Sequence, residues 1–114
     1  MPKSIVRTYS QYTKEALTLL SGLIRAARIE RKLSAQEVAE RAGISRSMLQ
    51  RIEKADPKCE IGAVFEVASI VGVPLFNAEL SSPKLANNIK RTEEKLALLP
   101  QRARKPQKAV DDDF

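Results

Sequence analysis

Two serines and one glycine within residues 33–54 constrain this chain more than any other feature of its sequence. Ser34 is followed three residues later by Glu37, which is the spacing of a capping box at a helix start. Gly43 then supplies the left-handed residue that ends many helices, and Ser45 is a good N-cap for a second helix. The sequence therefore predicts two short helices joined by a tight turn.

The apolar residues of these two helices indicate which sides face a core. They are Val38, Ala39 and Ala42 in the first helix and Ile44, Leu49 and Ile52 in the second. The second helix then exposes one polar face without an acidic residue, formed by Arg46, Ser47, Gln50 and Arg51. Arginine can pair with guanine and glutamine with adenine in the major groove of DNA, so this face has the chemistry of base readout. The alternative is an ordinary solvated surface.

The flanking segments predict further helices. An apolar stripe at helical spacing runs through residues 11–31 and consists of Ala16, Leu20, Leu23, Ile24 and Ala27, widened by Leu17 and Leu19. Arg25, Arg28 and Lys32 share a different, basic face. Residues 61–71 are nearly all apolar, which is typical of a helix buried on most sides, and Gly72 ends it.

The C-terminal part is less regular. Val73–Phe76 is β-prone, although Pro74 weakens the prediction of an edge strand there. Ser82 followed by Pro83 predicts a helix start, because proline is favoured at the first helical position. The narrow apolar seam of this helix suits pairing with one neighbour and consists of Leu85, Ile89, Leu96 and Leu99. Residues 100–114 have too little apolar content to pack and are predicted to be disordered on their own.

These segments together predict an all-α fold, a compact bundle of four to five helices with a short C-terminal strand and an extra C-terminal helix. The expected organisation is a lead-in at residues 1–9, a DNA-binding domain at 10–76, an amphipathic helix at 77–99 and a tail at 100–114.

Composition narrows the functional classes. Aromatic residues make up only 4% of the chain, so the core must be built from aliphatic side chains, which suits helices. The net charge is +6, and residues 1–60 carry twelve Lys or Arg against seven Asp or Glu. A basic excess of this kind fits a partner rich in phosphate.

Several chemistries are missing from the sequence. Cys59 is the only cysteine, so no intrachain disulfide can form, and we interpret it as a loop thiol without a role. Histidine is absent, which removes the commonest general base and metal ligand. We therefore expect no enzyme activity, no metal, no cofactor and no small-molecule ligand. The absence of a signal peptide or membrane-spanning stretch predicts a cytoplasmic protein without a membrane partner.

The stretch LSAQEVAERAGISRSMLQRIEK at residues 33–54 resembles the helix-turn-helix of the Xre family, which includes the lambdoid phage repressors. The family pattern has an L-[ST]-x-x-x-[LV]-A core, then A-G-[IV]-S, then a recognition helix that ends in I-E. The resemblance continues downstream through IGAVFEVASIVGV and upstream through residues 24–31. It implies a lambda-repressor-like DNA-binding domain that recognises double-stranded operator DNA as a homodimer.

The resemblance also implies roles for individual residues. Base contacts are implied for Arg46, Ser47, Gln50 and Arg51, and phosphate contacts for Ser34, Gln36, Ser45 and Lys54. Glu53 matches an acidic residue that pairs with an arginine of the first helix, here Arg28. One departure is Ala35, where the family usually has a glutamine that contacts phosphate; Gln36 follows one step later and is the candidate substitute.

Within this family the chain is most similar to HipB-type antitoxins, which bind HipA-type kinase toxins. The segments responsible are RTYSQYTKEALTLLSGLIR, RIEKADPKCEIGAVFEV and the tail ending in three aspartates and a phenylalanine. The alternatives are a stand-alone Xre repressor and a protein-interaction module without DNA binding. Dimer or partner contacts are expected at Leu75, Phe76, Leu85, Ile89, Leu96 and Phe114, and the sequence leaves open whether the strand or the C-terminal helix closes the dimer.

Overall fold

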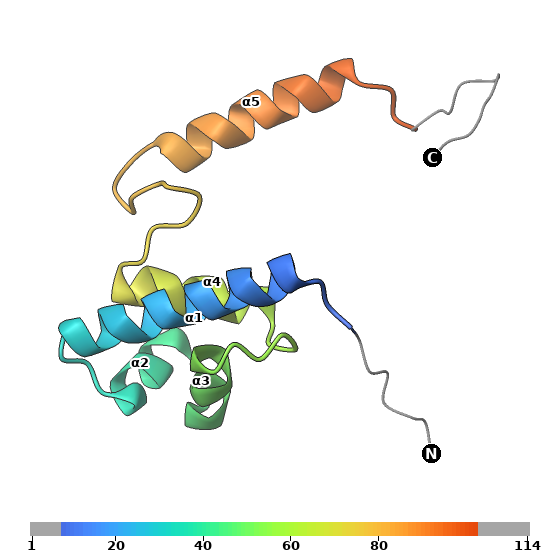
Figure 1. Cartoon of the computed structure of the whole chain (residues 1–114). Coiled ribbons are helices and arrows are strands. Elements are labelled where there is room, and N and C mark those ends of the chain that lie inside the picture. Colours follow the sequence, from blue (N-terminus) through green and yellow to red (C-terminus); the bar gives the residue numbers. More distant parts are fainter. Residues whose placement is uncertain (1–7, 103–114) are drawn as a thin grey trace. The chain divides into compact units, whose positions relative to one another are not determined.

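The computed structural model describes residues 8–102 and contains five α-helices in that part of the chain (Figure 1). They are α1 (Gln11–Glu30), α2 (Ala35–Ala42), α3 (Arg46–Glu53), α4 (Ile61–Val71) and α5 (Lys84–Leu98). The chain divides after Leu80 into two units, the first containing α1–α4 and the second containing α5. The prediction of an all-helical fold with four to five helices is confirmed.

The first unit is a four-helix arrangement around one aliphatic core. Helix α2 packs against α3 and α4, and α1 packs across the same two helices. The buried core contains Ile24, Val38, Ala39, Leu49, Ile52, Val67, Ala68, Val71 and Val73. Every predicted inward residue of α2 and α3 lies in this core or packs against it, so the assignment of their inner faces is confirmed.

Helix α1 has two apolar sides, of which only one faces this core. Ile24 is fully buried, and Leu20 and Ala27 are partly buried against the core. Leu23, by contrast, is 47% exposed, and Ala16 is also exposed. The single predicted stripe was therefore wrong in part, because α3 and α4 contact α1 along one narrow side and leave the adjacent apolar row uncovered.

The predicted strand at Val73–Phe76 is not present. Among residues 8–102 the β pairing consists of one isolated antiparallel bridge between Leu75 and Ala78, closed by a 2.9 Å hydrogen bond from the Ala78 N–H to the Leu75 carbonyl. Phe76 and Asn77 both have positive φ angles, of 55° and 57°. The segment is thus a tight turn rather than an extended strand, and it buries Val73 and Ala78 instead of pairing with a neighbour.

Helix α5 differs from the other four because none of its residues is buried. It begins one residue later than predicted, with Pro83 at the N-cap rather than at the first helical position. The Lys84 N–H donates to the Ser82 hydroxyl oxygen at 3.1 Å, so Ser82 supports the turn that leads into the helix. No helix in the described part of the chain is long and apolar enough to cross a membrane.

Candidate nucleic-acid interface

The turn between α2 and α3 is built by the local signals in the sequence. The Glu37 N–H donates to the Ser34 hydroxyl oxygen at 3.0 Å, and the Ser34 N–H donates to the Glu37 carboxylate at 2.8 Å. These hydrogen bonds hold the pKa of Glu37 below its usual value. Gly43 has a φ of 70° and ends α2, and Ser45 caps α3 by accepting from the Met48 N–H. The predicted capping box, glycine turn and second N-cap are all confirmed.

Helix α3 separates an apolar side from a polar side. Leu49 and Ile52 are buried in the core, whereas Arg46, Ser47 and Gln50 are exposed on the opposite side. Arg46, Gln50 and Lys54 are spaced four residues apart and therefore form one row along the exposed side. This row presents a guanidinium, an amide and an ammonium group to solvent.

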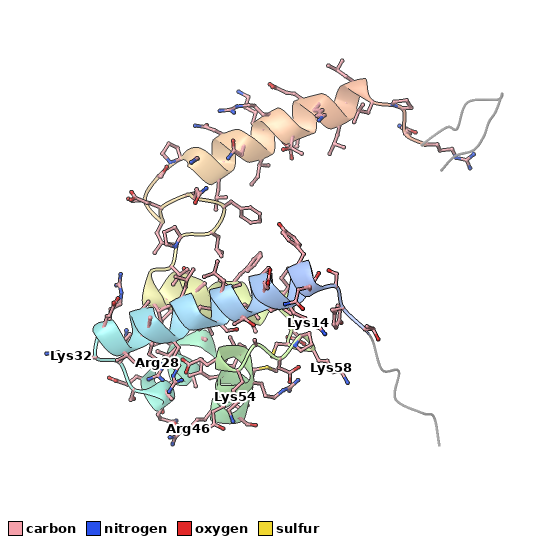
Figure 2. All side chains as sticks on the ribbon, in the orientation of Figure 1. Lys14, Arg28, Lys32, Arg46, Lys54 and Lys58 are labelled. Carbon is pink, nitrogen blue, oxygen red and sulfur yellow. The ribbon has the colours of Figure 1, made fainter. Side chains whose placement is uncertain are left out.

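The row borders a hollow of about 300 Å³ between α3 and α1. Besides Arg46, Gln50 and Lys54, its lining includes Arg25, Arg28, Ala35 and Glu53. Figure 2 shows Arg28, Arg46 and Lys54 within this region. The sequence placed Arg25 on the basic face of α1 and assigned it no role in a site, yet it lines the same hollow as the α3 row. The available signal was its spacing of three residues from Arg28, which puts both on one side of α1.

Two interactions fix the C-terminal end of α3 to α1. The Arg28 guanidinium donates to both carboxylate oxygens of Glu53, from Nε at 2.7 Å and from Nη2 at 3.1 Å. The side chains are 15% and 11% exposed, and the hydrogen bond to Glu53 raises the pKa of Arg28 against the opposing effect of burial. The buried Ser21 hydroxyl donates to the Ile52 carbonyl at 2.7 Å. The polar row is thus presented on a helix whose far end is anchored.

Arg51 is placed differently from the other predicted base-contacting residues. Its Nε donates to the Asp56 carboxylate at 2.8 Å, and its side chain is 44% exposed. The pair raises the pKa of Arg51 and lowers the pKa of Asp56, and the Lys58 N–H also donates to that carboxylate. Any contact of Arg51 with a nucleic acid must therefore use its Nη groups.

The residues predicted to hold phosphates lie around the two helix starts and the end of α3. Ser34 and Ser45 are exposed, but each hydroxyl oxygen already accepts from a backbone N–H, which leaves the hydroxyl proton as the group that can donate outward. Gln36 is exposed and its amide donates to the Glu40 carboxylate at 3.0 Å. Lys54 is exposed at the C-cap of α3.

The predicted dimer or partner contacts fall into three groups. Leu75 packs partly against the core, and Phe76 is 71% exposed with its ring edge-to-face to Phe65, at a centroid distance of 6.3 Å. On α5 the exposed fractions are 40% for Leu85, 56% for Ile89 and 61% for Leu96. Phe114 lies outside the described residues.

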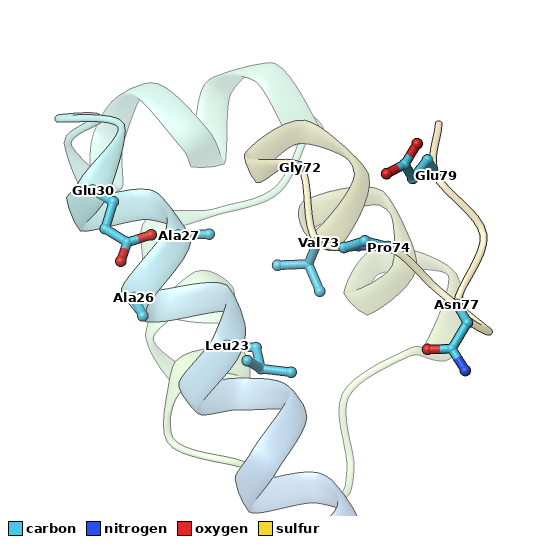
Figure 3. A pocket seen from close by; sticks show the side chains of 9 residues that line it. All are labelled: Leu23, Ala26, Ala27, Glu30, Gly72, Val73, Pro74, Asn77 and Glu79. Atoms are coloured by element: carbon cyan, nitrogen blue, oxygen red, sulfur yellow. The ribbon is translucent and has the colours of Figure 1, made fainter. Parts of the chain in front are cut away.

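A second hollow, of about 540 Å³, lies between α1 and the segment that follows α4 (Figure 3). Its walls are mainly apolar, with Leu23, Val73 and Pro74 pointing toward the space, and Glu30 and Glu79 belong to the same lining. Carboxylates repel phosphate, so this surface has chemistry opposite to that of the hollow beside α3.

Comparison with known proteins agrees with this geometry. The model of the Helix-turn-helix family matches residues 24–76, from the middle of α1 to the turn after α4. No curated protein and no solved structure matches the chain. The matched range contains the anchored α3, its capped start and the glycine turn before it. Residues 24–76 therefore have the fold of a helix-turn-helix domain, and α2 and α3 correspond to the motif.

Proposed function

We propose that the chain is a sequence-specific DNA-binding transcriptional repressor that inserts α3 into the major groove of operator DNA. The observation that carries this proposal is the row of Arg46, Gln50 and Lys54, exposed opposite the buried side of α3. Arg46 and Gln50 can donate to base edges, whereas Lys54 at the helix end can hold a phosphate. Ser47 lies beside this row, and Arg51 contributes from its edge through its Nη groups.

Substitutions separate base reading from backbone attraction. Arg46→Ala and Gln50→Ala should each cost about 1–3 kcal/mol of binding to a duplex selected from a random pool and should relax its sequence preference. Lys54→Ala should weaken binding to selected and random duplexes alike, because a phosphate contact carries no sequence information. The measurement is a titration by fluorescence anisotropy at fixed salt. Equal losses on both duplexes for all three variants would contradict base reading by α3.

Arg51 provides a comparison within the same helix. Because its Nε is held by Asp56, we expect Arg51→Ala to change sequence preference less than Arg46→Ala does. The matched variant Asp56→Asn releases the guanidinium and should leave sequence preference unchanged or strengthen binding. A loss of preference in Arg51→Ala as large as that in Arg46→Ala would assign Arg51 a direct base contact.

We further propose that the functional form is a homodimer in which α5 pairs with α5 of a second copy. A single helix of this length with no buried residue is marginal in water, so α5 needs a partner. Its apolar positions repeat at alternating steps of four and three residues, which is the spacing of a pairing seam. Within the helix they are Leu85, Ile89 and Leu96, with Thr92 in line, whereas Leu99, predicted from the sequence as the next position, is the C-cap and has extended backbone. A dimer presents two recognition helices to an inverted repeat with half-sites about one helical turn apart.

Sedimentation tests this interface. The full chain should be dimeric at micromolar concentration, whereas Ile89→Asp and a deletion of residues 81–114 should both give monomers with weaker operator binding. Lys90→Asp is a matched control on α5 outside the seam and should remain dimeric. If the deleted protein is still dimeric, the dimer interface lies within residues 1–80 and not on α5.

A second candidate is a role as antitoxin that binds and neutralises a HipA-like kinase toxin while repressing its own operon. The sequence resemblance to HipB-type antitoxins supports it. The uncovered apolar row of α1, which consists of Ala16, Leu19 and Leu23, offers a surface that a second protein could cover. The direct test is to co-express the chain with a kinase-like protein encoded in the adjacent reading frame, if one is there. Leu19→Glu together with Leu23→Glu should then weaken complex formation and leave DNA binding intact. An adjacent frame without such a kinase would favour the stand-alone repressor.

A further inference from the structure

A basic groove of about 470 Å³ lies where the first turns of α1 meet the loop that follows α3. Three lysines line it: Lys14 from α1, Lys54 from the end of α3 and Lys58 from the loop. Leu17 and Pro57 belong to the same lining and give the groove apolar surface between the ammonium groups. Neither Lys14 nor Lys58 was singled out by the sequence, because 44 residues separate them along the chain.

Nearby carboxylates offset the positive charge of this groove only in part. Within residues 8–102 none of the three lysines is in an ion pair. Two of the nearby carboxylates are paired with arginines: Asp56 accepts from Arg51, while it also attracts Lys58, and Glu53 accepts from Arg28. Glu15 accepts from Gln11 one turn earlier. Three lysines therefore line one concave surface, and none of them is fixed in an ion pair within the described residues.

The groove is continuous with the hollow beside the recognition helix. Lys54 lines both of them. Figure 2 shows Lys14 and Lys58 at one end of α1, with Lys54 between this pair and Arg46. A duplex whose major groove accepts α3 would run past Lys54, and its sugar–phosphate backbone would meet Lys14 and Lys58 next.

We propose that this groove clamps the DNA backbone beside the bases read by α3. The three ammonium groups bind phosphate oxygens, and the apolar lining packs against deoxyribose. Tyr9 and Thr18 also line the groove and supply hydroxyl donors of the kind that commonly contact DNA phosphates. The proposal rests on the proposed DNA-binding function and extends it to a second contact region.

This clamp lies partly outside the helix-turn-helix domain. The family match begins at Ile24, whereas Tyr9, Lys14 and Thr18 precede it. The part of α1 before Ile24 therefore lies outside the matched range, and the clamp gives that part a function. It would add affinity for any duplex without changing which bases are preferred.

The test is the salt dependence of DNA binding by the full-length protein. Each phosphate contact contributes about 0.9 to the steepness with which log affinity falls against log salt concentration. A fourfold rise in salt concentration therefore lowers the binding constant about 3.5-fold for each contact. Lys14→Gln and Lys58→Gln should each lower the slope by roughly that amount, and the double variant by about twice as much. Lys90→Gln, which removes the same charge from α5, should leave the slope unchanged, and Lys14→Arg should retain it.

The outcomes separate this inference from the proposed function. If the wild-type protein binds a 30-base-pair random duplex with a steep salt slope and both groove variants keep that slope, the clamp is refuted while DNA binding stands. The clamp is supported if Lys14→Gln and Lys58→Gln lower the salt slope without altering sequence preference, while Arg46→Ala does alter sequence preference. Circular dichroism checks that each variant keeps the helix content of the wild-type protein. If the double variant unfolds, the salt slopes of the two single variants test the clamp. A wild-type protein without affinity for any duplex would refute both.

Discussion

Replacing Glu53 with glutamine isolates the charge of the Arg28–Glu53 pair, because the new side chain keeps the size and one acceptor oxygen. In the native protein the guanidinium donates to both carboxylate oxygens, and its Nη1 donates to the Leu33 carbonyl at 3.0 Å. The substitution removes one of these three hydrogen bonds and the whole of the charge attraction. The Leu33 contact persists and continues to hold the arginine in place.

The magnitude follows from the depth of burial. Breaking a fully buried pair costs about 3–5 kcal/mol, and a fully exposed pair contributes about 0–1 kcal/mol. With side chains 15% and 11% exposed, this pair is nearer the buried limit, but glutamine retains part of the contact. We expect Glu53→Gln to lower the free energy of unfolding by about 2 kcal/mol, which for a domain of this size lowers Tm by roughly 8–16 °C.

The assay is thermal unfolding followed by circular dichroism at fixed protein concentration, since association would otherwise shift Tm. Glu66→Gln on α4 is the matched control, because it removes the same charge from an exposed position and should change stability by less than about 0.5 kcal/mol. A double-mutant cycle with Arg28→Gln should give a favourable coupling energy. If Glu53→Gln and Glu66→Gln shift Tm equally, the pair does not anchor α3.

Three further predictions concern other parts of the first unit. Ser21→Ala removes the shorter of two hydrogen bonds to the Ile52 carbonyl, which still accepts from the Ala55 N–H at 3.2 Å, and should cost about 0.5–1.5 kcal/mol in urea unfolding; an unchanged midpoint would contradict this. Gly43→Ala should destabilise by about 1 kcal/mol because of the positive φ, whereas Gly62→Ala in α4 should stabilise by a similar amount; effects of equal sign would be inconsistent with the backbone argument. Burial raises the pKa of Cys59, so iodoacetamide should modify it more slowly at pH 8 than it modifies a free thiol, and equal rates would disprove the shielding.

Local signals predicted the motif because they act within a few residues. The Ser34 capping box, the Gly43 turn and the Ser45 cap each depend on neighbours in the chain, and all three formed as expected. Long-range contacts had no such signal. Ser21 is a polar residue near an apolar stripe, and nothing in its surroundings indicates that its hydroxyl meets a carbonyl 31 residues later.

The sequence was least informative where a segment depends on what it packs against. Val73–Phe76 has the composition of a strand, but it finds no neighbouring strand and closes into a turn instead. Leu20 and Leu23 look equivalent on a helical projection, yet only Leu20 packs against the core. Which of two adjacent apolar rows is buried depends on the positions of α3 and α4, and periodicity alone does not contain that information.

The length of α1 lets one helix contribute both to anchoring α3 and to the proposed clamp. Ser21 and Arg28 lie seven residues apart, two turns of helix, so both face α3 and hold its C-terminal end. Lys14 lies a further seven residues before Ser21 and keeps the same side of the helix, which brings it beyond the end of α3 to the loop that carries Lys58. A shorter α1 beginning near Ile24, where the family match begins, would keep the Arg28 anchor but would lose both the Ser21 hydrogen bond and the lysine. If the proposed clamp holds, the part of α1 before Ile24 links the stability of α3 to the strength of DNA backbone binding.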